Sequence, residues 1–126
     1  MKLWLTVAAL SGFLSVAIGA FAAHGLEGRL PEEALAWLAT GLRYHMLHVA
    51  GLLAVGVLAG QAPTRSLTLA GGGFLLGTLL FSGLLYAMAL TGARWLGMIV
   101  PLGGLGFLVG WVALACYALS RQEERT

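Results

Sequence analysis

The side chains that could do chemistry in this chain gather around three histidines. His45 and His48 are three residues apart, so on a helix they share one face, while His24 stands earlier in the chain. Imidazole rings bind protons and metals near neutral pH, and the phenols of Tyr44 and Tyr86 can hydrogen-bond to them. These five residues are the candidate ligand or proton site, and the spacing predicts that one ligand or proton meets both His45 and His48.

Other kinds of active site have little support in the sequence. Three histidines give only three nitrogen ligands, and there is neither an HExxH pattern nor a pair of cysteines for zinc. The chain contains no aspartate and no GxSxG motif, which disfavours acyl transfer. We therefore predict no catalytic residue and no metal site, name no cofactor, and expect a protein that is not an enzyme.

The elements that must position these side chains are membrane-spanning helices. Hydrophobic residues make up 60% of the 126 residues and charged residues 10%, more apolar surface than a small soluble fold can bury. Four stretches are nearly free of charge and close to the roughly 20 residues that cross a bilayer. We predict an all-α membrane protein, a single domain over residues 1–126, with spans at residues 3–23, 44–62, 66–90 and 95–119 in a compact four-helix bundle.

The second predicted span begins early, with an amphipathic segment. Pro31 suits the first turn of a helix, and Glu32 and Glu33 favour its positive end. Residues 31–43 mix apolar and polar side chains, as expected near lipid headgroups. We predict an interfacial helical segment over residues 31–43, with a bend or tilt near Gly41.

Four spans place both termini on one side of the membrane. Four basic residues face that side and three face the other: Lys2, Arg65, Arg121 and Arg125, against Arg29, Arg43 and Arg94. The positive-inside rule then favours cytoplasmic termini in a bacterial-type inner membrane. An alternative is a secretory signal peptide at the N-terminus, although its apolar run of about 20 residues exceeds the usual 7 to 15.

This topology puts the three histidines on one side of the membrane, together with possible charged partners. Those partners are Glu27, Arg43 and Arg94. Ionisable groups at membrane depth are costly and usually face a bundle interior or a cavity. The layer could therefore serve a small ligand, a proton or an ion.

Small residues recur at helical spacing and predict close helix packing. They are Ser11, Ser15 and Gly19 in the first span, the GxxxG pair Gly73 and Gly77 in the third, and the pair Gly106 and Gly110 in the fourth. Such stripes fit either packing within the bundle or a homo-oligomer seam. Pro101 is expected to kink the last span. No basic run with interleaved aromatic residues indicates a nucleic-acid partner.

Several stretches resemble the YgdD-like family of small membrane proteins. They are residues 19–26 (GAFAAHGL), residues 44–46 (YHM) with His48, residues 81–83 (FSG) with Tyr86, and residues 101–104 (PLGG). The similarity runs in order over essentially the whole chain. It implies a four-helix inner-membrane protein of a family, with vertebrate relatives, whose function is unknown, and it supplies no substrate, cofactor or catalytic residue.

Two functional hypotheses follow from the sequence. The first is a non-enzymatic protein that acts through helix association in the lipid bilayer, as a homo-oligomer or as an accessory subunit of another membrane protein. The alternative is binding or passage of a small ligand, proton or ion at the histidine and tyrosine layer. A cavity at these side chains, open to lipid or solvent, would favour the second hypothesis.

Overall fold

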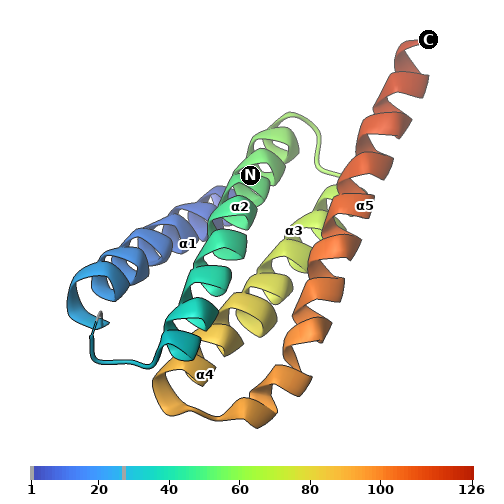
Figure 1. Cartoon of the computed structure of the whole chain (residues 1–126). Coiled ribbons are helices and arrows are strands. Elements are labelled where there is room, and N and C mark those ends of the chain that lie inside the picture. The colour runs from blue at the N-terminus through green and yellow to red at the C-terminus, as the bar shows by residue number, and fades with distance from the viewer. Residues whose placement is uncertain (1, 27) are drawn as a thin grey trace.

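Four helical rods run antiparallel in the computed structural model, which describes residues 2–26 and 28–126 (Figure 1). The elements are α1 (Lys2–Phe21), the π-helical turn η1 (Ala22–Leu26), α2 (Glu32–Gln61), α3 (Arg65–Gly77), the π-helical segment η2 (Thr78–Gly83), α4 (Leu84–Thr91), the 3₁₀ turn η3 (Arg94–Met98) and α5 (Val100–Arg125). The described residues contain no strand. The rods Lys2–Leu26, Glu32–Gln61, Arg65–Thr91 and Arg94–Arg125 are each long and apolar enough to cross a membrane. The all-α, four-helix membrane fold is confirmed.

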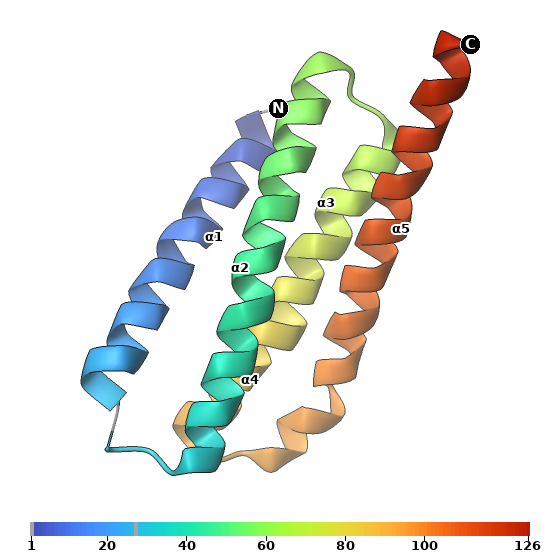
Figure 2. The same ribbon diagram turned by 45° about the horizontal axis from the view of Figure 1, so that its top comes forward.

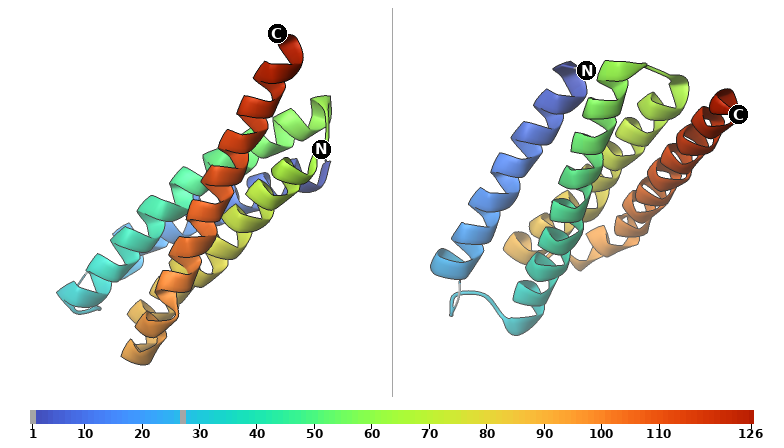
Figure 3. Two further views of the ribbon diagram at one scale, coloured as in Figure 1. Left: turned by 90° about the vertical axis from the view of Figure 1, so that its right-hand side faces the viewer. Right: turned by 90° about the horizontal axis from the view of Figure 1, so that it is seen from above.

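The rods form a bundle with one loosely held member. α1 packs against α2, whereas α5 packs mainly against α3 and η2. Viewed from the side, α1, α2, α3 and α5 follow one another across the molecule, and both termini lie at the same end (Figure 2). The view from above shows α1 on the far side of α2 from α5 (Figure 3). One flank of α1 therefore has no protein neighbour.

Glycines let α3 and α5 approach until their backbones touch. A methyl group added at Gly73 would lie 2.6 Å from the carbonyl oxygen of Gly106 and 2.8 Å from the amide nitrogen of Gly110. One added at Gly77 would lie 2.9 Å from the carbonyl oxygen of Gly103. A methyl group at either glycine would overlap backbone atoms of α5. The two GxxxG pairs therefore face each other inside one chain.

The small residues of α1 also face α2, but less closely. Ser11 and Ser15 are buried, and a methyl group added at Gly19 would meet Leu42 of α2 at 4.0 Å. Farther along α2, Leu52 and Val55 pack with Ala70 and Phe74 of α3 in the main apolar core.

Two expected features concern the continuity of the rods. α2 is one unbroken α-helix from Glu32 to Gln61, so it begins well before the predicted span at residues 44–62, as expected, and Gly41 provides a close contact with α4. Pro101 lies in the first turn of α5, after the 3₁₀ turn η3, and not inside a continuous helix. A first turn has no partner for the missing amide hydrogen, so proline begins the helix there without cost.

Candidate functional site: a lipid-facing groove above His45

The two candidate histidines of α2 occupy successive positions of one buried seam. Its members alternate at spacings of four and three residues: Gly41, His45, His48, Leu52, Val55 and Ala59. Such a seam consists of two columns that lean toward different neighbouring helices. His45 and His48 are both almost fully buried, yet they contact different partners. The two side chains are therefore directed at different neighbours, because a shared helix face is wide enough to touch two helices, and binding of one ligand by both histidines stays a prediction.

His48 points toward α5, where its hydrogen bonds fix its tautomer. Nδ1 donates to the carbonyl oxygen of Tyr44 at 2.6 Å, and the indole Nε1 of Trp111 donates to Nε2 at 3.0 Å. A carbonyl can only accept and an indole N–H can only donate, so Nδ1 must carry the proton. The ring also stacks on Phe107 with centroids 3.5 Å apart. His48 is a neutral, fully bonded packing residue.

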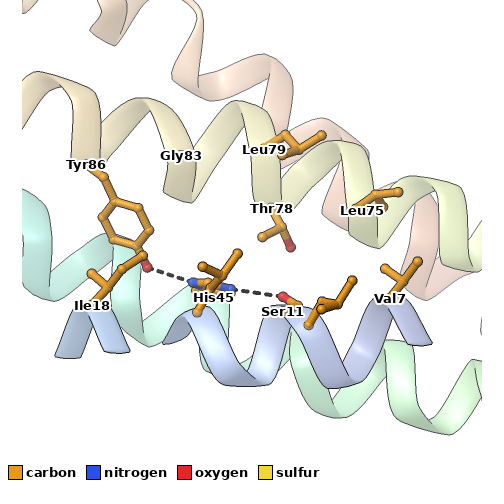
Figure 4. Close-up of a pocket in the computed structure, with 11 residues that line it drawn as sticks. Val7, Ser11, Ile18, His45, Leu75, Thr78, Leu79, Gly83 and Tyr86 are labelled. Atoms are coloured by element: carbon orange, nitrogen blue, oxygen red, sulfur yellow. Dashed lines mark hydrogen bonds between the residues drawn. The ribbon is translucent and has the colours of Figure 1, made fainter. Parts of the chain in front are cut away.

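His45 points toward α1 and α4 and is held by two hydroxyl groups. Its Nε2 lies 2.9 Å from the hydroxyl oxygen of Ser11, and its Nδ1 lies 2.9 Å from the hydroxyl oxygen of Tyr86 (Figure 4). A hydroxyl can donate or accept, so either ring nitrogen of His45 can carry the proton. The Ser11–His45–Tyr86 triad thus joins three helices by hydrogen bonds of undetermined direction.

The position of Tyr86 depends on a close approach between α4 and α2. A methyl group on Gly41 would lie 2.8 Å from the Tyr86 ring, so glycine at this position lets the ring lie flat against α2. In the π-helical segment η2 the hydroxyl of Ser82 donates to the carbonyl oxygen of Gly41 at 2.7 Å. π-Helical turns reorient the residues that follow them and are frequent at functional sites. Here η2 precedes α4 and aims Tyr86 at His45.

A groove of about 340 Å³ opens above the triad, between α1 and the rod formed by α3, η2 and α4 (Figure 4). Ser11, His45 and Tyr86 form part of its lining, and most of the rest is aliphatic: Val7, Leu10, Leu14, Ile18, Leu75 and Leu79. Its exposed surface is almost entirely apolar, and no charged side chain from residues 2–26 and 28–126 lines it. Thr78 also lines it, but its hydroxyl donates to the carbonyl oxygen of Phe74 in its own helix. The groove lies on the open flank of α1, so in a bilayer it faces lipid.

The remaining predicted site residues lie elsewhere. His24 is exposed on η1, and Arg43 is exposed on the face of α2 that points out of the bundle. Tyr44 is 40% exposed on the α5 side, with its ring 4.7 Å from that of Phe81. Glu27 lies outside the described residues. The structure therefore brings His45 together with Tyr86, and His48 together with Tyr44 on the α5 side, and leaves His24, Arg43 and Arg94 apart from both pairs.

Arg94 belongs to a contact at the end of the bundle opposite the termini. Its guanidinium donates two hydrogen bonds to the carboxylate of Glu33, one of them 2.7 Å long between Nη1 and Oε1. It also lies 5.6 Å from the centre of the Trp37 ring. Both charged side chains are largely exposed, so this ion pair connects α2 to η3 at the rim and does not reach the histidines.

Two residues of the site were not predicted to have this role. Ser11 was expected only to pack, and its spacing with Ser15 gave no sign of a histidine partner. Trp111, with Gly110, belongs to the stretches that carry the family resemblance but was given no role, although an indole within a span needs a hydrogen-bond acceptor. Among residues 2–26 and 28–126, no three His, Cys or Glu side chains lie close enough to hold a metal ion.

Comparison with known proteins places the chain in a family. The sequence model of the family described as "Protein of unknown function (DUF423)" matches residues 18–104. The chain belongs to the DUF423 family. The UPF0382 membrane protein of Haemophilus influenzae is 47% identical over 112 residues, which is 89% of this chain and 90% of the relative. YwdK, the UPF0382 membrane protein of Bacillus subtilis, is 41% identical over 94% of this chain and 98% of its own length.

The resemblance to YgdD-like proteins is confirmed as well. The UPF0382 inner membrane protein YgdD of Escherichia coli is 36% identical over 123 residues, or 98% of this chain and 94% of YgdD. No solved structure matches the chain. The DUF423 match includes His45, His48 and Tyr86, whereas Ser11 and Trp111 lie on either side of it. The family relationship and the four apolar rods agree that this is a membrane protein of unknown function.

Proposed function

We propose that this protein binds a neutral, membrane-dissolved small molecule in the groove above the Ser11–His45–Tyr86 triad. One observation carries the proposal: the hydrogen bonds of His45, whose directions are not fixed, lie at the floor of an apolar groove that opens to lipid. Binding sites for small molecules are typically apolar clefts with a few polar groups that orient the ligand. The polar groups here come from three separate helices.

The chemistry of the groove restricts the ligand. An aliphatic lining favours an aliphatic body, and a volume of about 340 Å³ is at the lower end of the range for ligand sites. Because no charged side chain lines the groove, a charged head group would lose its hydration without compensation. Ser11 and Tyr86 offer only hydroxyls. The expected ligand therefore carries a neutral hydroxyl or carbonyl group.

The depth of the triad supports entry from the lipid. Ser11 lies nine residues (11 − 2) after Lys2, or about 14 Å along a helix that rises about 1.5 Å per residue. That distance is close to half of a hydrocarbon layer of roughly 30 Å. In this proposal all four rods act as one domain, with Lys2, Arg65, Arg121 and Arg125 facing the cytoplasm.

Photolabelling in membrane vesicles tests the proposal. A medium-chain ketone with a photoreactive group is expected to label peptides of α1 and α3 that line the groove. Leu14→Trp, which places a bulky ring in the groove, is expected to reduce this labelling by roughly tenfold, equivalent to about 1.4 kcal/mol of binding.

The matched control is Leu53→Trp. Leu14 and Leu53 are both 51% exposed, but Leu53 lies on α2 away from the groove lining. Labelling that spreads over all lipid-facing peptides, or that Leu14→Trp and Leu53→Trp reduce equally, would contradict a binding site in the groove.

Helix association is the second candidate function, favoured by the open flank of α1. Leu10 and Phe13 are 61% and 71% exposed there, next to the same groove. However, the GxxxG pairs of α3 and α5 are occupied by each other, so they offer no seam to a partner. A dimer or accessory complex would instead use an exposed apolar face, such as the open flank of α1. Crosslinking from Phe13 in native membranes would then capture a defined protein, and capture of lipid alone argues against association.

A further inference from the structure

The two buried histidines differ in what their partners allow. His48 lies between a carbonyl oxygen and an indole N–H, each of which has one role, so only its Nδ1–H tautomer satisfies both. His45 lies between the hydroxyls of Ser11 and Tyr86, each of which can donate and accept. Two tautomers of His45 therefore satisfy the same heavy-atom geometry.

We propose that His45 is a tautomer switch, and that a neutral carbonyl group bound in the groove sets its direction. This inference rests on the proposed function, because the ligand that biases the switch is the ligand of the groove. It names the chemical group that the site recognises and the atoms that recognise it.

The two states of the triad differ in which end offers a proton to the groove. With the proton on Nδ1, Ser11 donates to Nε2, Nδ1 donates to the oxygen of Tyr86, and the Tyr86 hydroxyl hydrogen is free to donate outward. With the proton on Nε2, Tyr86 donates to Nδ1, Nε2 donates to Ser11, and the Ser11 hydroxyl hydrogen is the free one. Each state offers one outward donor, from opposite ends of the triad.

Conversion between the states moves protons only. When the switch leaves the Nε2–H state, Tyr86 gives its proton to Nδ1 and Nε2 gives its proton to Ser11. Ser11 releases its former proton to a water or ligand hydroxyl, and Tyr86 takes one from a water or ligand hydroxyl. One bond to hydrogen forms and one breaks at each oxygen, while Nδ1 gains one hydrogen, from Tyr86, and Nε2 loses one, to Ser11. Nothing is oxidised or reduced.

Tyr86 is only partly buried whereas Ser11 is buried, so a carbonyl ligand is expected to accept from Tyr86, and there it selects one state because it can only accept. To donate to the ligand, Tyr86 must use its single hydroxyl hydrogen, so the bond between Tyr86 and His45 can form only if Nδ1 donates. A ligand oxygen at Tyr86 therefore favours the Nδ1–H tautomer, in the way that any ligand shifts a population toward the state that it binds better. An alkane of the same length has no oxygen and leaves the ratio unchanged.

Nitrogen NMR of the full chain with labelled histidines, in lipid nanodiscs, tests this inference. Protonated and unprotonated ring nitrogens have well-separated shifts, so the tautomer ratio of each histidine can be read directly. Without ligand, His45 is expected to show both tautomers and His48 only Nδ1–H. Methyl octyl ketone should move the His45 ratio toward Nδ1–H by roughly tenfold, equivalent to about 1.4 kcal/mol. Decane should leave it unchanged, and His48 should not respond to either probe.

Tyr86→Phe keeps the ring and removes the hydroxyl. In this variant the ketone should still show contacts with Leu14 and Leu79 in the groove, but it should no longer change the His45 ratio. A His45 held in one tautomer in every sample, or shifted equally by decane, overturns the switch. Contacts in the groove without a tautomer change overturn the switch and leave the proposed function standing. If neither probe contacts the groove, the proposed function is contradicted.

Discussion

The packing of α3 against α5 gives the sharpest test of the fold, because two adjacent glycines of α3 have opposite surroundings. A methyl group added at Gly73 would lie 2.6 Å from the carbonyl oxygen of Gly106, whereas one added at Gly72 would meet no atom within 4 Å. Ordinary contact begins at 3.4 Å, so Gly73→Ala requires α3 and α5 to separate by about 0.8 Å (3.4 − 2.6). The atoms that this methyl group would meet, in Gly106 and Gly110, are backbone atoms, which cannot rotate away.

The two substitutions share their effect on the helix itself. Replacing glycine by alanine within a helix stabilises it by about 0.5–1 kcal/mol, and that gain is common to both variants. The clash at Gly73 costs about 1–3 kcal/mol, as overpacking of a tight interface does. We therefore expect Gly73→Ala to be less stable than Gly72→Ala by about 1–3 kcal/mol.

Unfolding in mixed micelles with increasing denaturing detergent, followed by tryptophan fluorescence, measures this difference. Size-exclusion chromatography with light scattering shows whether either variant changes its oligomeric state. Equal stability of Gly73→Ala and Gly72→Ala would refute the packing of α3 on α5 through their glycines. A change in oligomeric state for Gly73→Ala alone would place this seam between two chains.

Three further predictions concern the hydrogen bonds, the rim and the topology. Trp111→Phe leaves Nε2 of His48 without its donor, so we expect a loss of about 1–3 kcal/mol in unfolding free energy in the same micelle assay. Glu33→Gln weakens the exposed ion pair with Arg94, and we expect a loss of at most about 1 kcal/mol that disappears at high salt. A cysteine at Thr126 is expected to react with a membrane-impermeant maleimide only after intact cells are opened.

Each of these predictions has a control variant or a result that would contradict it. Trp95→Phe alters an indole that is 65% exposed and should leave stability unchanged, so an equal loss there would argue against a special role for Trp111. A loss above about 2 kcal/mol for Glu33→Gln would mean that the ion pair is buried by something other than the chain. Arg29→Cys should label in intact cells, and the reverse pattern would invert the proposed orientation; both cysteine variants are made with Cys116→Ser, which removes the native thiol.

The sequence alone predicted the four rods, because a membrane-spanning helix is recognised by a long run of uncharged, apolar residues. Uncharged stretches near 20 residues have few alternatives, and the four candidate spans of the structure coincide with them. The π-helical segment η2 could not be foreseen, since Thr78–Gly83 is as apolar as the helices on either side of it. The early start of α2 was predicted from Pro31, Glu32 and Glu33, whereas the packing of Gly41 against the Tyr86 ring has no local signal in the sequence.

The site was predicted in part for a related reason. Spacing alone identifies residues that share a helix face, and it put His45 and His48 on one face of α2. It cannot tell which neighbouring helix each residue meets, since that depends on how α1 and α5 flank α2. Ser11 and Trp111 therefore became partners of different histidines without any local signal. The groove likewise exists only because α1 packs on α2 and leaves its other flank open.

Mass spectrometry of the protein gently extracted from its native membrane tests the central claim most directly. We predict that a neutral molecule with an aliphatic body and a hydroxyl or carbonyl group co-purifies with the wild type and with Leu53→Trp in near-equal amounts. It should be absent from Leu14→Trp, whose added ring occupies the groove. The same bulk phospholipids in all three samples, with no such molecule, would contradict a ligand-binding groove above His45.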